Sequence, residues 1–390
     1  MITDYILKMP HTVYAGEHAL ENISNIMKDA KKVAVFSDQG IIGAGLLTYP
    51  LELMKNSGVE TVVLDNLPAE PTCDQAQEII DRFKLIKADL IVAIGGGSVM
   101  DIAKLSSILA TDKYGVRDLL ENPLLGEKCI KTLMIPTTAG TGSEATANSI
   151  VAVPEKELKV GIVNPAMIAD YVILDSRMIK KLPRKIAAAT GVDALAHAIE
   201  CFTSKKSNPF SDTFALEALD MIFHNIEEAC DNPDAMEAKK AMLIASFYAG
   251  VAITASGTTA VHALSYPLGG KYHIPHGVSN AMMLVPVMKF NEVACSEKFA
   301  LAYDRIVKTE KTEKTEKTTK SLEEKSAWII NKLDEIVKHL NIPTSLKDYG
   351  IGSEDLEILV TAGMGVQRLL ANNMREVTAE DARKLYLEIM

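Results

Sequence analysis

The stretch Leu90–Leu109 reads LIVAIGGGSVMDIAKLSSIL, and this order of residues decides the class of fold. Leu90–Ile94 is entirely apolar, which is typical of a strand buried on both faces of a parallel sheet. Residues 95–98 follow as a glycine turn, and Val99–Leu109 has the apolar spacing of a helix packed on a sheet. Strand, turn and helix together indicate an anion site, because backbone N–H groups can approach a phosphate and the helix dipole favours its charge.

We predict that this turn holds the pyrophosphate of a dinucleotide, through Gly95, Gly96, Gly97 and Ser98. The spacing differs from G-x-G-x-x-G, so a tight connection without a ligand is the alternative. A second loop, Pro136–Glu144 (PTTAGTGSE), also follows an apolar strand and is rich in hydroxyls and glycine. Two loops at the carboxyl ends of strands can hold one dinucleotide from both sides.

Asp38 stands at the end of another predicted strand, Val33–Ser37. A carboxylate at that position can accept hydrogen bonds from a ribose 2′-hydroxyl and repels a 2′-phosphate. Asp38 therefore favours NAD over NADP. A role as a helix N-cap or turn residue is equally open.

The fold class follows from how apolar runs are distributed along the chain. Short apolar runs alternate with helical patterns in the N-terminal half, at Lys32–Ser37, Val59–Leu64, Leu90–Ile94, Leu133–Pro136 and Val172–Leu174. This alternation predicts a doubly wound parallel sheet. From Lys180 onward helical periodicity takes over, as in Ser211–Cys230, Met236–Ala255 and Val278–Phe290. We therefore predict an α/β dinucleotide-binding domain at residues 1–181 and an all-α metal-binding domain at residues 182–390.

Composition narrows the range of partners. A net charge of -10 argues against nucleic acid or an anionic membrane as the main partner, because both need clustered Lys and Arg. The five cysteines form no CxxC pair, which indicates reduced thiols. Asp4 and Lys8 interrupt any N-terminal signal core, so we expect a cytoplasmic protein that acts on a small molecule. Thr309–Lys317 repeats Thr-Glu-Lys three times and is expected outside the core.

Asp193 and His197 lie four residues apart in Gly191–Phe202 (GVDALAHAIECF), a helical pattern. At this spacing two side chains share one face of a helix, with Cβ atoms about 5–6 Å apart, close enough for one metal ion. Taken alone the pair is weak evidence, since a simple hydrogen bond is the commoner reason for such neighbours.

A second group of candidates lies in Val261–Asn280 (VHALSYPLGGKYHIPHGVSN), which holds three of the eight histidines. His262 begins an apolar stretch that Pro267 and the two glycines after it are expected to break. His276 follows a proline at an expected helix start. We expect both side chains near helix ends and facing one cavity; the alternative for each is a core histidine with a structural hydrogen bond.

Three imidazoles and one carboxylate suit Fe(II), Zn(II), Co(II) or Ni(II) better than Mg(II) or Ca(II). An ion held by Asp193, His197, His262 and His276 would act as a Lewis acid on an alcohol or aldehyde oxygen. A nicotinamide placed by the two loops would then exchange a hydride with the substrate carbon.

Several segments together resemble the iron-containing (group III) alcohol dehydrogenases, a family that includes lactaldehyde reductase, 1,3-propanediol dehydrogenase and butanol dehydrogenases. They are Gly95–Asp101 (GGGSVMD), Pro136–Glu144, the segment from Pro183 through Asp193 and His197 to Glu200, and the segment from His262 to Gly277. The resemblance spans nearly the whole chain. It implies a dehydroquinate synthase-like fold, with an α/β dinucleotide-binding domain, a helical domain, and a catalytic metal in the cleft between them: Fe(2+), or alternatively Zn(2+).

Residue by residue, the resemblance implies metal ligands at Asp193, His197, His262 and His276, and pyrophosphate contacts at Gly95, Gly96, Gly97, Ser98, Thr137 and Thr138. Asp38 matches a position associated with NAD preference, with NADP as the alternative. Asn148 matches a position near the substrate in lactaldehyde reductase, and a strand hydrogen bond is its alternative role. The implied function is the interconversion of a small primary alcohol and its aldehyde with NAD(H), in a homo-oligomer.

This chain departs from its relatives at one position of interest. Many members carry a further histidine four residues after the third ligand, where this chain has Tyr266. We therefore hypothesise that His273 or Tyr266 accepts the proton of the alcohol. An ordinary loop role is the alternative for His273.

Two other classes of function compete with this interpretation. One is a zinc-dependent polyol or phosphate-substrate enzyme of the same fold, such as a glycerol dehydrogenase or a dehydroquinate synthase. No cluster of Lys and Arg surrounds Asn148, Ile253 and Tyr266 in the sequence, which argues against a phosphate substrate. The other is a non-catalytic protein that binds NAD or a metal.

Overall fold

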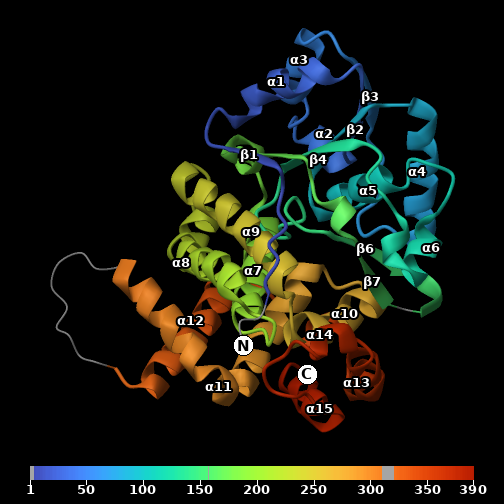
Figure 1. The fold of residues 1–390 in the computed structure, drawn as a ribbon. Coiled ribbons are helices and arrows are strands. Elements are labelled where there is room, and N and C mark those ends of the chain that lie inside the picture. Colours follow the sequence, from blue (N-terminus) through green and yellow to red (C-terminus); the bar gives the residue numbers. More distant parts are fainter. Residues whose placement is uncertain (1–3, 157, 310–319) are drawn as a thin grey trace. The chain divides into compact units, whose positions relative to one another are not determined.

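The computed structural model describes residues 4–156, 158–309 and 320–390, which form two compact units (Figure 1). One unit is Lys8–Leu182, and the other combines Pro183–Met390 with the N-terminal residues up to Leu7. The Thr-Glu-Lys repeats of Thr309–Lys317 lie, after Thr309, outside the described residues. The two units are described separately.

The first unit is built on a six-stranded sheet with the order β1-β8-β5-β4-β2-β3, in which every pair of neighbouring strands is parallel. The predicted doubly wound α/β architecture is therefore confirmed. Strand β1, with its mixed sequence TVYA, was not predicted from the pattern. The strands are β1 (Thr12–Ala15), β2 (Lys32–Phe36), β3 (Glu60–Leu64), β4 (Leu90–Gly95), β5 (Lys131–Pro136) and β8 (Tyr171–Leu174).

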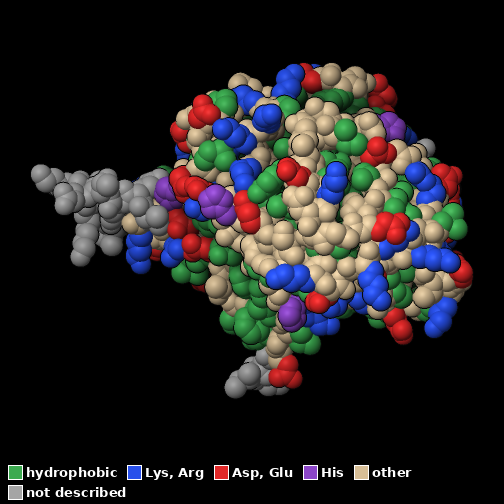
Figure 2. Space-filling model, turned by 90° about the horizontal axis from the view of Figure 1, so that it is seen from above, with side chains coloured by type: hydrophobic (Ala, Val, Ile, Leu, Met, Phe, Trp, Pro, Cys, Tyr) green, Lys and Arg blue, Asp and Glu red, His purple; other side chains and the backbone are tan. Residues whose placement is uncertain are grey.

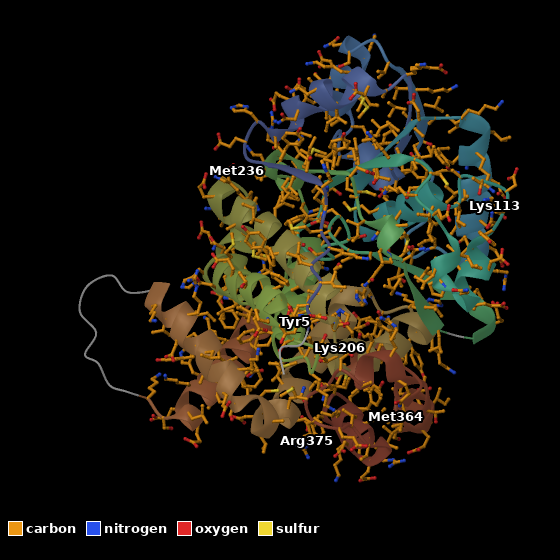
Figure 3. All side chains as sticks on the ribbon, in the orientation of Figure 1. Tyr5, Lys113, Lys206, Met236, Met364 and Arg375 are labelled. Carbon is orange, nitrogen blue, oxygen red and sulfur yellow. The ribbon has the colours of Figure 1, made fainter. Side chains whose placement is uncertain are left out.

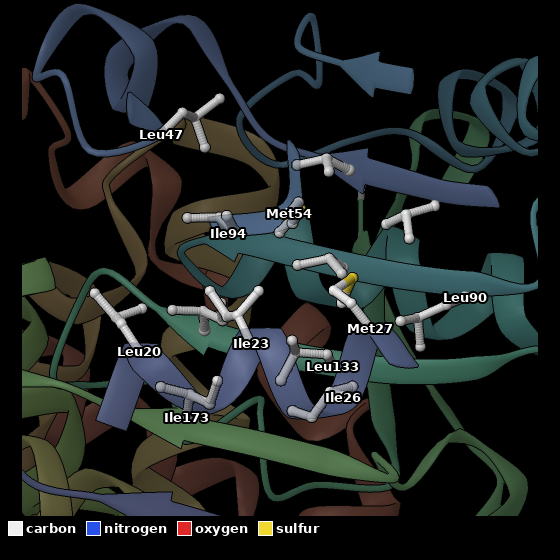
Figure 4. Close-up of a cluster of buried hydrophobic side chains, with 14 of the residues drawn as sticks. Leu20, Ile23, Ile26, Met27, Leu47, Met54, Leu90, Ile94, Leu133 and Ile173 are labelled. Atoms are coloured by element: carbon white, nitrogen blue, oxygen red, sulfur yellow. The ribbon is translucent and has the colours of Figure 1, made fainter. Parts of the chain in front are cut away.

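Helices cover both faces of this sheet, which explains why its central strands are continuous apolar runs rather than alternating ones. On one face Val33 and Val35 pack with Ile23 and Met54, from α1 (Ile23–Ile26) and α3 (Thr48–Asn56), in the cluster drawn in Figure 4. On the other face the Phe36 ring meets Phe83 at 5.5 Å between centroids. The remaining helices of this unit are α2 (Gln39–Gly43), α4 (Cys73–Ile86), α5 (Gly97–Ile108) and α6 (Val116–Glu121).

A separate antiparallel hairpin joins β6 (Asn148–Val153) to β7 (Leu158–Val163), with Asn148 opposite Val163. The sequence analysis did not predict it. Every second residue of β6 is buried and the others are half-buried, so the strand lacks the continuous apolar run that marks the central strands. The hairpin packs against α5.

The second unit is helical, as predicted from the periodicity after Lys180. Asn208 caps α8 by accepting from the N–H groups of Phe210 and Ser211, and Pro209 occupies the first helical position, where no N–H is needed. The helices are α7 (Arg184–Phe202), α8 (Pro209–Asp231), α9 (Met236–Ser256), α10 (Ala260–Tyr272), α11 (His276–Thr309), α12 (Leu322–His339), α13 (Leu356–Met364), α14 (Gln367–Leu370) and α15 (Ala379–Glu388).

One local expectation for this unit was wrong. Pro267 and the two glycines after it do not interrupt the helix, because α10 continues through them to Tyr272. The first ten residues of α10, Ala260–Gly269, are all buried. The free energy of burying this helix among its neighbours outweighs the weak helix propensity of proline and glycine.

Arg375, which follows α14 and is labelled in Figure 3, contacts α11. Its guanidinium lies 3.8 Å from the centre of the Phe290 ring, and Nη1 donates to the carbonyl oxygen of Phe290 at 2.9 Å. On the face seen in Figure 2, basic and acidic side chains are interspersed.

Among the described residues no single helix is long and apolar enough to cross a membrane. Helices α9 and α10 pass such a test by length and composition as a bent pair, with 106° between them.

Candidate metal centre and nucleotide pocket

Asp193 and His197 project from adjacent turns of α7. Both are buried, and His197 Nε2 lies 3.8 Å from Asp193 Oδ1. Because α8, α9 and α11 all pack against α7, these polar groups lie in the interior of the helical unit. Polar groups in such an interior need partners, and the other two candidate ligands supply them.

His262 is the third residue of α10 and His276 is the first residue of α11. Their Nε2 atoms lie 3.7 and 3.6 Å from Asp193 Oδ1. Gly277 makes this approach feasible, since a Cβ atom there would lie 2.2 Å from the carbonyl oxygen of Ala189 on α7. The missing side chain therefore lets the start of α11 contact α7 one turn before Asp193.

The ligand atoms of these four residues all lie within 4.8 Å of one another. Burial raises the pKa of Asp193, but the three imidazoles and the side-chain N–H of Asn280 outweigh burial and hold that pKa below its ordinary value. The His276 side chain keeps 33% of its surface exposed, so the cluster can be reached from that side. Three imidazole nitrogens and one carboxylate are a suitable donor set for Fe(II) or Zn(II).

Glu200 orients one of the imidazoles. Its carboxylate, fully buried, accepts from the N–H and hydroxyl of Thr259 at 3.1 and 2.6 Å and from the N–H of Val261 at 2.7 Å. It also accepts from His262 Nδ1. Burial lowers the pKa of His262, but Glu200 and Asp193 outweigh burial and raise it above its ordinary value. When the ring is neutral with its proton on Nδ1, its lone pair is on Nε2, the atom that faces Asp193.

Glu200 belongs to one of the motifs in the sequence but had no predicted role, and Asn280 was not predicted. A usable signal was present for both. Glu200 lies seven residues after Asp193, and Asn280 lies four after His276, so each shares a helix face with a candidate ligand.

In the α/β unit, residues 95–98 lie where the motif predicted, at the end of β4 and the start of α5. A Cβ atom at Gly97 would lie 2.9 Å from the Thr141 side chain, so glycine permits close approach of the second loop. The turn borders a pocket of about 360 Å³ whose lining includes Asp38, Gly96, Gly97 and Ser98. Gly95 does not line this pocket. A Cβ atom there would lie 2.6 Å from the Val99 side chain, so glycine permits the close approach of the first turn of α5.

The second loop adjoins the first. The N–H of Thr137 donates to the carbonyl oxygen of Gly95 at 3.0 Å, and the Thr138 methyl would lie 3.7 Å from a Cβ at Gly96. Among the described residues Thr137 Oγ1 and Glu144 Oε1 are buried without a hydrogen-bond partner. Burial raises the pKa of Glu144 to about 7, although Lys104 acts to lower it. Buried polar atoms without partners indicate that this loop is suited to a polar ligand.

Asp38 has the N-cap role considered for it. Its Oδ1 accepts from the N–H of Ile41 at 3.0 Å and so caps α2, and the residue also lines the pocket beside Gly96. A carboxylate has two oxygens, so capping leaves room for a second hydrogen bond.

Asn148 begins β6, and its carbonyl oxygen accepts from the buried ammonium of Lys104. The same Nζ donates to the carbonyl oxygen of Ser143 at 3.0 Å and pairs with Asp101 Oδ1 at 3.0 Å. Lys104 thereby joins α5 to the end of the second loop and to the hairpin. Lys104 was not predicted, because a single lysine on a mainly apolar helix gives no motif; its place three residues after Asp101 is the signal that was present.

Tyr266 and His273, the two candidates for the proton acceptor, differ in position. Tyr266 is buried one turn after His262 on α10, and its ring centre lies 6.5 Å from that of His262 and 6.1 Å from that of His276. His273 is exposed and ends α10 in the left-handed conformation, with φ 56°. The structure therefore brings Tyr266 to the imidazoles.

Comparison with known proteins identifies the class. A family model described as iron-containing alcohol dehydrogenase matches residues 10–176, and one described as Fe-containing alcohol dehydrogenase family, C-terminal, matches residues 187–390. The chain is 31% identical to long-chain-alcohol dehydrogenase 1 of Geobacillus thermodenitrificans over 97% of its length and 94% of that protein. It is 29% identical to the NAD-dependent methanol dehydrogenase of Bacillus methanolicus, over 90% and 91% of the two chains.

The fold is also similar to that of the alcohol dehydrogenase from Oenococcus oeni, with a TM-score of 0.91, 28% identity, and 99% and 100% of the two chains covered. The chain therefore belongs to the iron-containing alcohol dehydrogenase family, and the resemblance inferred from its motifs is confirmed. It is an oxidoreductase of the alcohol and aldehyde type, and the competing functions are not favoured.

Proposed function

We propose that this enzyme interconverts a small primary alcohol and its aldehyde by hydride transfer with NAD(H), using one divalent ion held by Asp193, His197, His262 and His276. The observation that carries the proposal is the convergence of four ligand atoms from three helices within 4.8 Å. A bound Fe²⁺ or Zn²⁺ supplies Lewis acidity, which lowers the pKa of an alcohol and polarises a carbonyl. Association into a homo-oligomer stays a prediction from the resemblance.

The chain itself contributes binding and orientation. The turn at residues 95–98 offers backbone N–H groups and the N-terminus of the twelve-residue helix α5 to the pyrophosphate. Asp38 accepts from the ribose hydroxyl, and Thr137 and Thr138 bind from the second loop. Glu200 keeps the lone pair of His262 turned toward Asp193. Asn148 is proposed to contact the substrate.

The test is to purify the protein anaerobically and to follow NADH oxidation with a panel of short aldehydes, after loading with Fe²⁺ or Zn²⁺. Turnover that depends on the added ion supports the proposal. Tight NADH binding without turnover at any ion would contradict it and would favour a non-catalytic protein.

The cofactor preference is tested by Asp38→Ser. Serine also caps helices well, so this change keeps α2 capped and removes only the charge that repels a 2′-phosphate. We expect the ratio of kcat/KM for NADPH to that for NADH to rise by about 10-fold or more. Asp38→Asn is the matched control for shape. An unchanged ratio in both variants would assign Asp38 to capping alone.

The proton acceptor is tested by Tyr266→Phe and His273→Ala. The buried position of Tyr266 beside two candidate ligands supports Tyr266, so Tyr266→Phe is expected to lower kcat by about 100-fold. His273→Ala is expected to leave kcat and its pH profile unchanged, since His273 is exposed. The reverse pattern, with loss in the histidine variant, would transfer the role to His273.

A further inference from the structure

A buried amide lies among the four candidate ligands. Asn280, fully buried on α11 one turn after His276, places Nδ2 2.7 Å from Asp193 Oδ1. The same nitrogen lies 3.1 Å from His262 Nε2 and 3.2 Å from His276 Nε2. An amide nitrogen carries two N–H groups, so Asn280 can donate to at most two of these three atoms at a time.

The orientation of this amide follows from its neighbours. In the neutral ring of His262, Nδ1 donates its proton to a hydrogen bond with the Glu200 carboxylate and Nε2 carries a lone pair, and Asp193 Oδ1 is an acceptor. Both groups therefore need a donor, and the NH₂ end of Asn280 is the end that can supply it. The other end is fixed by the hydroxyl of Ser265, also fully buried, which donates to Asn280 Oδ1 at 2.5 Å.

These contacts matter most when no ion is bound. A buried carboxylate and imidazole lone pairs are costly to leave without partners. A lone pair that binds an ion cannot also accept an N–H, so amide and ion compete for His262 and His276. Hydrogen bonds that stabilise only the ion-free enzyme therefore weaken binding of the ion by the same free energy.

We infer that Asn280, anchored by Ser265, is a positioning residue that stabilises the ion-free enzyme by bonding its ligand atoms, and that it lowers the affinity for the ion in return. The helical unit can then fold and hold its ligands in place before it takes up metal. This inference rests on the proposed function, which assigns the four ligands.

The test compares Asn280→Leu with the wild type, each stripped with a chelator and then measured with and without Zn²⁺. Leucine has nearly the shape of asparagine but no N–H. We expect the melting temperature of the ion-free variant to fall by about 2–5 °C more than that of the Zn²⁺-loaded variant. We expect Zn²⁺, measured by competition with a fluorescent chelator, to bind about 5- to 10-fold more tightly.

Asn291→Leu is the matched control. Asn291 is buried on the same helix and exchanges side-chain hydrogen bonds with Asn373, away from the ligands, so both of its melting temperatures should fall equally. Ser265→Ala should act like Asn280→Leu but more weakly, and it decides the matter if the leucine variant does not fold.

The possible outcomes distinguish a failure of the inference about Asn280 from a failure of the proposed metal site. Equal losses of melting temperature in the ion-free and loaded Asn280→Leu protein, or weaker Zn²⁺ binding, would overturn the inference while leaving the metal site intact. A wild-type protein whose melting temperature does not respond to Zn²⁺ or Fe²⁺ would overturn the proposed metal site and the inference with it.

Discussion

Asp193→Asn is expected to lower kcat/KM for aldehyde reduction by about 1,000-fold or more, because it weakens the hold on the ion whose Lewis acidity is worth several kcal/mol. Asp193 Oδ1 lies between 3.6 and 3.8 Å from the Nε2 atoms of His197, His262 and His276, so it is close to all three imidazoles. Asparagine keeps the shape and can still accept from Asn280, but it removes the negative charge.

The measurement is metal content by mass spectrometry after dialysis, together with kcat/KM at saturating Fe²⁺ or Zn²⁺. Asp220→Asn is the matched control, since Asp220 is also buried in the helical unit but pairs with Arg305 at 2.9 Å. The control should retain metal and activity. Full metal content and normal turnover in Asp193→Asn would show that these four residues are not the catalytic metal site.

Lys104→Met is expected to lower the stability of the α/β unit by about 3–5 kcal/mol, equivalent to roughly 10 °C in melting temperature, because it leaves the buried Asp101 without its cation. Burial lowers the pKa of Lys104, while Asp101 acts to raise it and favours the charged form. The ammonium also holds the carbonyl oxygens of Ser143 and Asn148. Its loss should therefore raise the KM for NADH as well.

Two further variants test whether the unpaired buried charge causes this loss of stability. Lys32→Met removes an ion pair of similar length, 2.7 Å to Glu60, but at the surface, so its cost should stay below about 1 kcal/mol. Adding Asp101→Asn to Lys104→Met removes the stranded charge and should restore part of the melting temperature. If Lys104→Met and Lys32→Met cost the same, the buried cation does not stabilise the loops.

The elements that the sequence predicted best are those whose pattern has a single cause. The central strands are buried on both faces, so their apolar runs are continuous, and the glycine turn after Leu90–Ile94 marks the end of a strand and the start of a helix. The hairpin and β1 escaped prediction because they are half-buried, and half-burial leaves a mixed pattern that loops also show. The break expected at Pro267 was wrong because burial of α10 outweighed local propensity.

The candidate metal ligands were also predicted only in part from the sequence. Spacing alone placed Asp193 and His197 on one helix face, and the group of histidines in Val261–Asn280 pointed to His262 and His276. Only the packing of α10 and α11 against α7, which the bare backbone of Gly277 permits, brings atoms far apart in sequence within 4.8 Å. No local pattern encodes such long-range distances.

By itself, therefore, the sequence determined the two structural classes, the glycine turn between strand and helix, and the chemical types of residue that could hold an ion. Tertiary structure decided which other groups surround them: Glu200 behind His262, Asn280 among the ligand atoms, and Lys104 beneath the loops. The physical reason is that buried polar groups must find partners wherever packing brings them together, and packing joins residues that are far apart along the chain.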